Sequence, residues 1–264
     1  MKNGVKTLQM NRPLQLNPWT FHMQEYFFRL FEEAAKDEAV KAVILTGTGR
    51  FYSAGVSFAS LFNRPMSPRA AHEMLRTSNE RLFSLFLDFP KPLVVAANGP
   101  AVGATVTSAT LCDAIVAADT AYFSTPFARL SIPPEGCSSA HFPRLLGPDN
   151  ARRMLREDWA PDAREALSIG LVHSVVPGPD LLPAAQQLAE EIVASRRPKP
   201  LVQQGLLEEY HRVNARESKD LADAVFDYPF LRAQYTLWKS KGKTREAAIF
   251  GGLYLLRPLW GLFL

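Results

Sequence analysis

Two short apolar runs, each closed by a glycine turn, determine which folds are open to this chain. Residues 43–45 are followed by a turn at 47–49, and residues 93–97 are followed by a turn at 98–100. Runs of this length, bounded by glycine, are typical of buried strands. Because segments with helical spacing separate such strands, the sequence predicts an α/β fold of the βαβ type.

Helix start signals divide the rest of the chain. A capping residue followed by proline, as in residues 17–18 and again in residues 67–68, favours the start of a helix, and the second of these helices is expected to run toward Leu87. Asp162 predicts a short helix that ends at Gly170, before a strand over residues 171–176. A further amphipathic helix is expected over residues 181–197.

Length and composition indicate one sizeable domain with a full core. The chain has 264 residues, of which 47% are hydrophobic and 21% are charged. We predict a core domain over residues 1–197 and a helical C-terminal region with an apolar tail over residues 198–264, because Arg197-Pro198 marks a break. The net charge of +4 suits an anionic ligand. Basic residues are not interleaved with aromatic ones, so we do not expect nucleic acid as a partner.

The apolar tail, residues 249–264, is too short and too interrupted to cross a membrane. It contains 16 residues, three glycines and the pair Arg257-Pro258, whereas a spanning helix needs about 20 apolar residues. We expect the tail to pack on the body of the protein or on a partner subunit, with peripheral membrane contact as the alternative. The N-terminus is not typical of a secretory signal, and the C-terminus is not a peroxisomal address of the S-K-L type.

The cysteines and histidines do not have metal-ligand spacing, so no metal site is predicted. Cys112 and Cys137 are expected to be structural thiols. His141 lies near the candidate site described next, where it could either pack or contact a site residue from behind.

The candidate general base is Glu135. It lies among apolar and proline residues in the segment 126–147. A carboxylate with few polar neighbours is poorly solvated, so its pKa rises toward neutral pH, as a general base requires. The alternative is an ordinary glutamate in a surface loop.

Two glycine-containing turns could present backbone N–H groups to a ligand. The first is Ser53-Ala54-Gly55-Val56-Ser57, where small residues allow close approach of the backbone. The second is Gly103-Ala104, which opens a segment suited to a helix, and helix N-termini favour negative charge.

Taken together, these segments resemble the crotonase superfamily of enoyl-CoA hydratases and isomerases. The resemblance runs from about Met10 to about Pro177. It rests on the following motifs: NRP at 11–13, FYSAGVSF at 51–58, KPLVVAANGPAVG at 91–103, CDAIVAADTAYFSTPF at 112–127 and EALSIGLVHSVVP at 165–177. The resemblance implies a spiral of ββα turns, an acyl-CoA thioester substrate, no metal or redox cofactor, and a homotrimer or hexamer.

The resemblance also implies roles for single residues. The N–H groups of Val56 and Ala104 would hold the thioester oxygen as it becomes an enolate, and residues 53–57 with Gly103 would cradle the thioester end of coenzyme A. Many members carry aspartate where this chain has Ser57, which predicts altered loop packing. The helix over residues 68–87 borders the acyl pocket in the family, so Met74, Leu75 and Phe83 are expected to be either core residues or substrate contacts.

The number of carboxylates separates the possible reactions. Hydratases of the family use two glutamates, and the matching positions here are Thr107 and Phe127. Glu135 falls where isomerases of the peroxisomal type carry their single base, and one carboxylate suffices to move a proton from C2 to C4. The prediction is therefore a Δ3,Δ2-enoyl-CoA isomerase, with peroxisomal residence implied by the resemblance alone and a cytosolic location otherwise. The alternatives are a hydratase or another enolate enzyme, a thioesterase, and a non-catalytic subunit that binds CoA esters.

Overall fold

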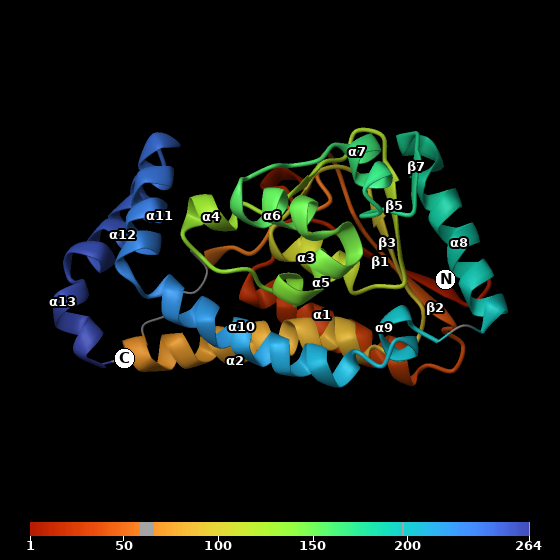
Figure 1. Ribbon diagram of the computed structural model, residues 1–264, viewed down its shortest axis with the longest axis horizontal. Helices are drawn as coiled ribbons and strands as arrows, with labels where there is room; N and C mark the ends of the chain where they lie inside the picture. The colour runs from red at the N-terminus through yellow and green to blue at the C-terminus, as the bar shows by residue number, and fades with distance from the viewer. Residues whose placement is uncertain (59–65, 197, 264) are drawn as a thin grey trace.

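A five-stranded parallel sheet forms the centre of the fold (Figure 1). The computed structural model describes residues 1–58, 66–196 and 198–263. The strands lie in the following order: β1 (Val5–Met10), β2 (Ala42–Gly47), β3 (Leu93–Ala97), β5 (Ala114–Ala118) and β7 (Ser174–Val176). All four neighbouring pairs are parallel. The predicted α/β class is therefore confirmed.

The two predicted apolar runs lie in β2 and β3, and every residue of these strands is buried. Alternate residues face two different layers. Ile44 and Val94 pack under α8 (Leu181–Ser195), whereas Leu45 and Val95 face the main core. Helices cover both faces of such a sheet, which explains why β2 and β3 are buried along their whole length.

The prediction of a strand over residues 171–176 was too long. The N–H groups of Leu171 and Val172 donate to the carbonyl of Ala166, so these two residues close the end of α7 (Ala163–Ser168). Pairing with β5 begins only at Ser174.

Two of the three predicted helix starts are confirmed. Ser67 caps α2 (Pro68–Asp88) by accepting the N–H of Ala70. Asp162 and Glu165 form a reciprocal capping box at α7. The helix predicted over 181–197 ends at Ser195, because Arg196 takes a left-handed conformation.

The third predicted start, at Asn17-Pro18, was wrong. Helix α1 (Phe21–Lys36) begins after Thr20, whose side chain caps it. Asn17 instead has a positive φ of 51°, and its side chain is committed to the backbone of a distant loop, as described below. A cap requires that the side chain be free to reach the N–H groups of the next turn, and here it is not.

A smaller parallel pair, β4 (Ala101–Val102) and β6 (Phe123–Ser124), lies beside the main sheet. Helix α3 (Ala104–Thr110) follows β4 directly, as predicted from Gly103-Ala104. Three further helices continue the chain after β6: α4 (Phe127–Leu130), α5 (Ser138–Leu146) and α6 (Pro148–Arg156).

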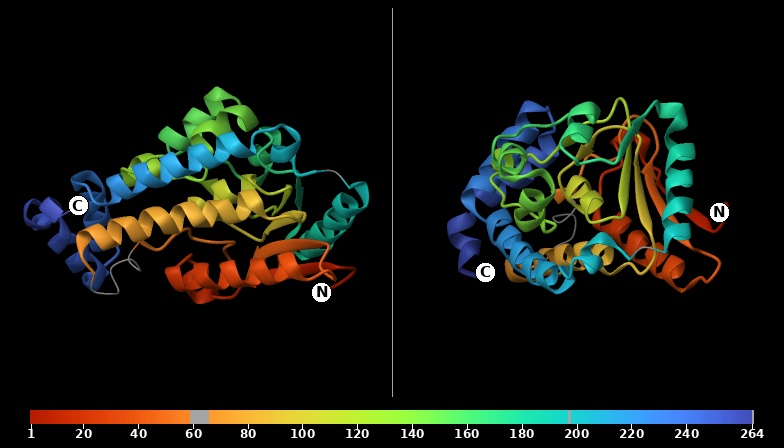
Figure 2. Two further views of the ribbon diagram at one scale, coloured as in Figure 1. Left: turned by 90° about the horizontal axis from the view of Figure 1, so that it is seen from below. Right: turned by 45° about the vertical axis from the view of Figure 1, so that its right-hand side comes forward.

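The C-terminal part is helical, as predicted. It comprises α9 (Pro200–Gln203), α10 (Leu207–Val225), α11 (Tyr228–Ser240), α12 (Thr244–Leu255) and α13 (Arg257–Trp260). Helix α10 lies along α2, and α11 to α13 lie at the end of the molecule opposite α8 (Figures 1 and 2). Because α10 also packs on α5, the C-terminal region contributes to the candidate site, and the division of the chain at residue 197 stays a prediction.

One side of the apolar tail packs on the body of the protein. Phe250 is fully buried against Phe230, and Trp260 contacts Phe226. The other side leaves Leu255, Leu262 and other leucines exposed. Within the described residues, helices with the length and apolar character needed to cross a membrane are absent.

Candidate active site

Glu135 is a buried carboxyl group in the loop between α4 and α5. Only 3% of the residue is exposed, so the alternative of an ordinary surface glutamate is wrong. Its Oε2 atom is buried and has no hydrogen-bond partner among the described residues. Burial raises the pKa of Glu135 from the ordinary 4.5 to about 8, and the nearby charge of Glu217 acts in the same direction. The group can therefore both take up and release a proton near neutral pH.

The turn that carries Glu135 depends on a glycine. Gly136 has a φ of 68°, and a Cβ there would lie 2.3 Å from Cε1 of Phe83 and 2.6 Å from Oγ1 of Thr107. Only glycine fits so close to α2 and α3 with this backbone conformation. The close approach of Gly136 to Thr107 places the neighbouring Glu135 beside α3.

A small cavity of about 10 Å³, close to the space that one water molecule needs, joins Glu135 to the predicted oxyanion loop. Glu135 and Val56 both line it. The other lining residues are Phe21, Gln24, Phe58, Leu75, Ser78, Asn79 and Leu221. The cavity is mostly apolar, so a carboxyl group that opens into it is poorly solvated.

The loop 53–57 is fixed to the segment that leads into α3. The N–H of Ser53 donates to the carbonyl of Pro100, and the carbonyl of Ser53 accepts the N–H of Val102. Gly55, with a φ of 88°, lies so close that a Cβ there would be 2.8 Å from the Val102 carbonyl oxygen. The two predicted ligand-binding turns are therefore neighbours in space.

The N–H groups of Val56 and Ala104 are the two predicted donors; Val56 lines the cavity, whereas Ala104 is not among its described lining residues. Their chain neighbours are bonded, since Ser57 donates to the Trp19 carbonyl and Gly103 donates to the Ser124 carbonyl. Neither the Val56 N–H nor the Ala104 N–H has an acceptor among the described residues. Ala104 is also the first residue of α3, where the unpaired N–H groups of a helix favour negative charge.

The sequence did not reveal the residue that holds the loop 53–57. Asn17 is fully buried, and its Nδ2 group donates to the carbonyls of Thr48 and Phe51, each over 2.9 Å. The backbone carbonyl of Asn17 accepts a hydrogen bond from the hydroxyl of Ser53 over 2.7 Å. A buried asparagine with its hydrogen-bonding groups satisfied fixes local backbone geometry, so Asn17 orders the start of the loop 53–57.

The two positions that carry glutamate in hydratases cannot transfer protons here. Thr107 is fully buried, and its hydroxyl donates to the carbonyl of Ala104 over 3.2 Å. Phe127 is buried, with its ring facing Gly103. Among the described residues that line the cavity, Glu135 alone has an ionisable side chain.

The residues named on helix α2 divide between cavity and core. Leu75 lines the cavity, Phe83 is buried against Gly136, and Met74 packs on the core. His141 packs: its ring bonds the hydroxyl of Tyr210 and the carbonyl of Thr110. Burial lowers the pKa of His141 to about 4, so the imidazole is neutral.

The C-terminal part contributes residues that the sequence did not reveal. Leu221 on α10 lines the cavity, and Glu217 lies one helical turn before it. The available signal was a set of polar residues on the buried face of α10, namely Asn214, Glu217 and Ser218. Buried polar groups of this kind require partners, and the sequence does not identify them.

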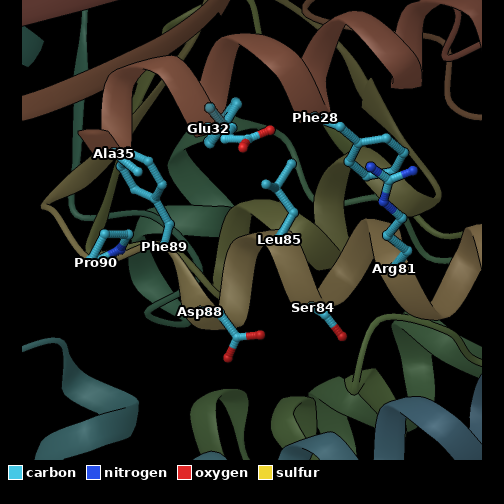
Figure 3. Close-up of a pocket in the computed structure, with 10 residues that line it drawn as sticks. Phe28, Glu32, Ala35, Arg81, Ser84, Leu85, Asp88, Phe89 and Pro90 are labelled. Atoms are coloured by element: carbon cyan, nitrogen blue, oxygen red, sulfur yellow. The ribbon is translucent and has the colours of Figure 1, made fainter. Parts of the chain in front are cut away.

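A larger open groove of about 280 Å³ lies between α1 and α2 (Figure 3). Phe28, Leu85 and Phe89 form its apolar wall, and Arg81 stacks on Phe28 with 3.8 Å between the guanidinium carbon and the ring centroid. It contains none of the predicted site residues. Size alone therefore does not locate the site.

A metal centre was not predicted, and the described residues do not bring together three or more His, Cys, Asp or Glu side chains that could hold an ion. The two cysteines are free and buried. Burial raises the pKa of Cys112 to about 12 and that of Cys137 still further, so neither is a nucleophile.

Comparison with known proteins agrees with this geometry. A sequence model of the enoyl-CoA hydratase/isomerase family matches residues 1–234. The mouse protein "Enoyl-CoA delta isomerase 3, peroxisomal" is 39% identical over 179 residues, which are 67% of this chain and 55% of that protein. The human "Enoyl-CoA delta isomerase 2" is 35% identical over 233 residues, 82% of this chain and 56% of that protein. The chain thus spans about half the length of these relatives.

The fold also matches solved structures. The crystal structure of an enoyl-CoA hydratase/isomerase from Pseudoalteromonas atlantica T6c superimposes with a TM-score of 0.80 at 28% identity. The match covers 91% of this chain and 95% of that one.

Proposed function

The chain belongs to the enoyl-CoA hydratase/isomerase family, and from that premise we propose that it is an acyl-CoA isomerase that converts 3-enoyl-CoA to 2-trans-enoyl-CoA. The observation that carries the proposal is the buried carboxyl group of Glu135, which lines the cavity and whose Oε2 has no hydrogen-bond partner among the described residues. The names of the mouse and human relatives support the isomerase assignment.

Glu135 is the proton carrier. As a carboxylate it removes a proton from C2 of the acyl chain, and the electrons of that C–H bond form an enolate whose double bond is conjugated with the original one. Glu135 then returns the proton to C4, which leaves the double bond between C2 and C3. One group in a water-poor cavity suffices, because the proton leaves C2 and returns to C4 on the same face of the acyl chain.

The N–H groups of Val56 and Ala104 stabilise the enolate oxygen. The oxygen gains negative charge only as the proton leaves C2, so donors aimed at it favour the transition state over the substrate. Each such donor is worth about 3 to 4 kcal/mol. The loop 53–57 and Gly103 hold the thioester end of coenzyme A, which enters as part of the substrate, and the reaction requires no metal or redox group.

The occupants of the two hydratase positions favour isomerisation over water addition. Thr107 donates its hydroxyl to a backbone carbonyl and Phe127 has no exchangeable proton, so a second group to activate water is lacking among the described cavity residues. A homotrimer or hexamer, and the peroxisomal location named for the mouse relative, stay predictions for this chain.

The test is identification of the product. Purified protein is incubated with 3-enoyl-CoA of several chain lengths, and the conjugated 2-enoyl thioester is followed by ultraviolet absorbance. We expect the absorbance to rise, with no release of free thiol and no 3-hydroxyacyl-CoA from 2-enoyl-CoA. Water addition or thiol release as the main reaction would contradict the proposal, as would binding of every CoA ester without turnover.

A further inference from the structure

Glu217 is the second carboxyl group near Glu135, and it does not line the cavity. It lies on α10, is only 3% exposed, and reaches across to the turn that follows Glu135. Its Oε2 accepts the N–H of Cys137 over 2.7 Å, and its Oε1 accepts the N–H of Ser139 over 2.9 Å. Both oxygens of the carboxylate are therefore bonded to the backbone at the start of α5.

The backbone that Glu217 holds has an uncommon conformation. Gly136 and Cys137 have consecutive positive φ angles of 68° and 64°, and residues other than glycine rarely adopt such values. Successive N–H groups in turns of this kind converge on one side and bind anions, and the positive end of a helix adds to the effect. Here the anion is supplied from within the chain, by α10.

We propose that Glu217 is a positioning residue for Glu135: by binding the N–H groups of Cys137 and Ser139, it fixes the turn that directs the Glu135 carboxyl group into the cavity. Because these bonds hold Glu217 beside that turn, its negative charge also favours the protonated form of Glu135. The role in turnover rests on the proposed isomerase function. The coupling between the two carboxyl groups does not depend on it.

The charged groups around this pair are few. Arg216, on the same helix, favours the ionised form of Glu217, against the larger effect of burial, and donates to the hydroxyl of Ser139. The thiol of Cys137 lies beside Glu217 and is neutral, because burial raises its pKa. The other helices that reach the pair contribute neutral groups at the cavity, namely Asn79 from α2, Thr107 from α3 and Gln24 from α1.

Further along α5, His141 is neutral and bonds Tyr210 of α10, and Arg144 is paired with Glu209 at the surface. Among the described residues, Glu217 is consequently the charged group that acts on Glu135. Burial raises the pKa of Glu217 to about 6, with its hydrogen bonds acting in the opposite direction, so Glu217 is ionised when Glu135 begins to titrate.

The experiment compares the wild type with Glu217→Gln, which keeps the shape of the side chain and removes its charge. The matched control is Glu208→Gln, an exposed carboxylate on the same helix that pairs with Arg212. The titration of the Glu135 carboxyl carbon is followed by NMR in protein labelled with ¹³C at glutamate Cδ, and Glu135→Gln identifies its signal. The kcat and KM for 3-enoyl-CoA are measured over the same pH range.

In Glu217→Gln we expect the midpoint of the Glu135 titration to fall by about one pH unit, since removal of a neighbouring negative charge favours ionisation. The acid limb of the kcat profile should move with it, kcat should fall about tenfold because the turn is less well fixed, and KM should change less than about twofold. An unchanged midpoint would overturn the proposal. A purely structural residue would lower kcat without moving the midpoint.

Glu217→Asp keeps the charge but cannot reach both N–H groups. Glu217→Asp should keep the wild-type midpoint of the Glu135 titration, and its kcat should fall. If Glu217→Gln does not fold, this variant tests the positioning role. A wild-type kcat in Glu217→Asp would contradict that role. If the wild type does not isomerise 3-enoyl-CoA, the proposed function fails, whereas the NMR midpoint still decides the coupling of Glu217 to Glu135.

Discussion

At the scale of single residues, the candidate site contains a carboxyl group whose environment makes folding costly. Burial without a hydrogen-bond partner for Oε2 among the described residues favours the neutral acid. An unfolded chain solvates this group normally. Glu135 therefore reduces stability wherever the unfolded chain ionises and the folded protein does not.

The pH dependence of this effect has a definite sign. Below about pH 4.5, Glu135 is protonated in both states and has no effect; as pH rises toward about 8, only the unfolded chain loses the proton, so the free energy of unfolding falls. We expect Glu135→Gln to be more stable than the wild type at pH 8, by on the order of 3 kcal/mol, and nearly equal to it at pH 4.5. Thermal unfolding at both pH values measures this. A stability difference that does not depend on pH would contradict the burial of an ionisable base.

The apolar and proline residues next to Glu135 in the sequence predicted its burial, which the structure confirms, whereas its role as a base stays a prediction. The sequence was not sufficient to identify Glu217, whose bonds to Cys137 and Ser139 join residues that are 80 and 78 positions apart. Asn17 was misassigned for the same reason: its side chain could cap a helix locally, but it bonds the backbone of Thr48 and Phe51 instead. Local pattern predicts such a residue only when its partners are also local.

At the scale of secondary structure elements, buried strands and helix caps were predicted because each depends on a few neighbouring residues. The contacts that assemble the site are between elements. His141 is an example, since it joins α5 to the end of α3 through Thr110 and to α10 through Tyr210. These three helices carry the Ala104 N–H, the turn after Glu135, and Glu217.

Because burial lowers the pKa of His141 to about 4, acid should loosen this junction. The stability that the neutral ring contributes is present above about pH 6.5 and is lost as pH falls toward 4, since the unfolded chain binds the proton first. We expect the stability advantage of the wild type over His141→Gln to shrink by on the order of 2 kcal/mol between pH 7 and pH 4.5. Urea unfolding at the two pH values tests this, and an advantage that grows in acid would refute it.

At the scale of the whole molecule, the C-terminal helices are connected to the cavity through aromatic rings. Phe58 lines the cavity and packs edge-on against Phe230 of α11, with 5.1 Å between ring centroids. Phe230 packs in turn against Phe250 of α12, at 6.2 Å. The C-terminal helices therefore support one wall of the cavity, and the residues that line such a wall determine substrate preference.

Phe230→Leu should consequently change substrate preference. The smaller side chain leaves space behind Phe58, and we expect kcat/KM to shift toward longer or bulkier acyl chains at a stability cost of about 1 to 3 kcal/mol. The control is Phe263→Leu, because Phe263 is 67% exposed and should leave the preference unchanged. A series of 3-enoyl-CoA substrates measures the shift. An unchanged preference in Phe230→Leu would separate the C-terminal helices from the acyl pocket.

The most direct test of the central claim is turnover by Glu135→Gln, measured with saturating 3-enoyl-CoA and with CoA-ester affinity determined in parallel. A single proton carrier predicts that kcat falls by at least about 10³-fold while affinity changes less than about threefold, since the amide keeps the shape of the side chain but cannot carry the proton. A variant that isomerises within about tenfold of the wild-type rate would show that another group moves the proton.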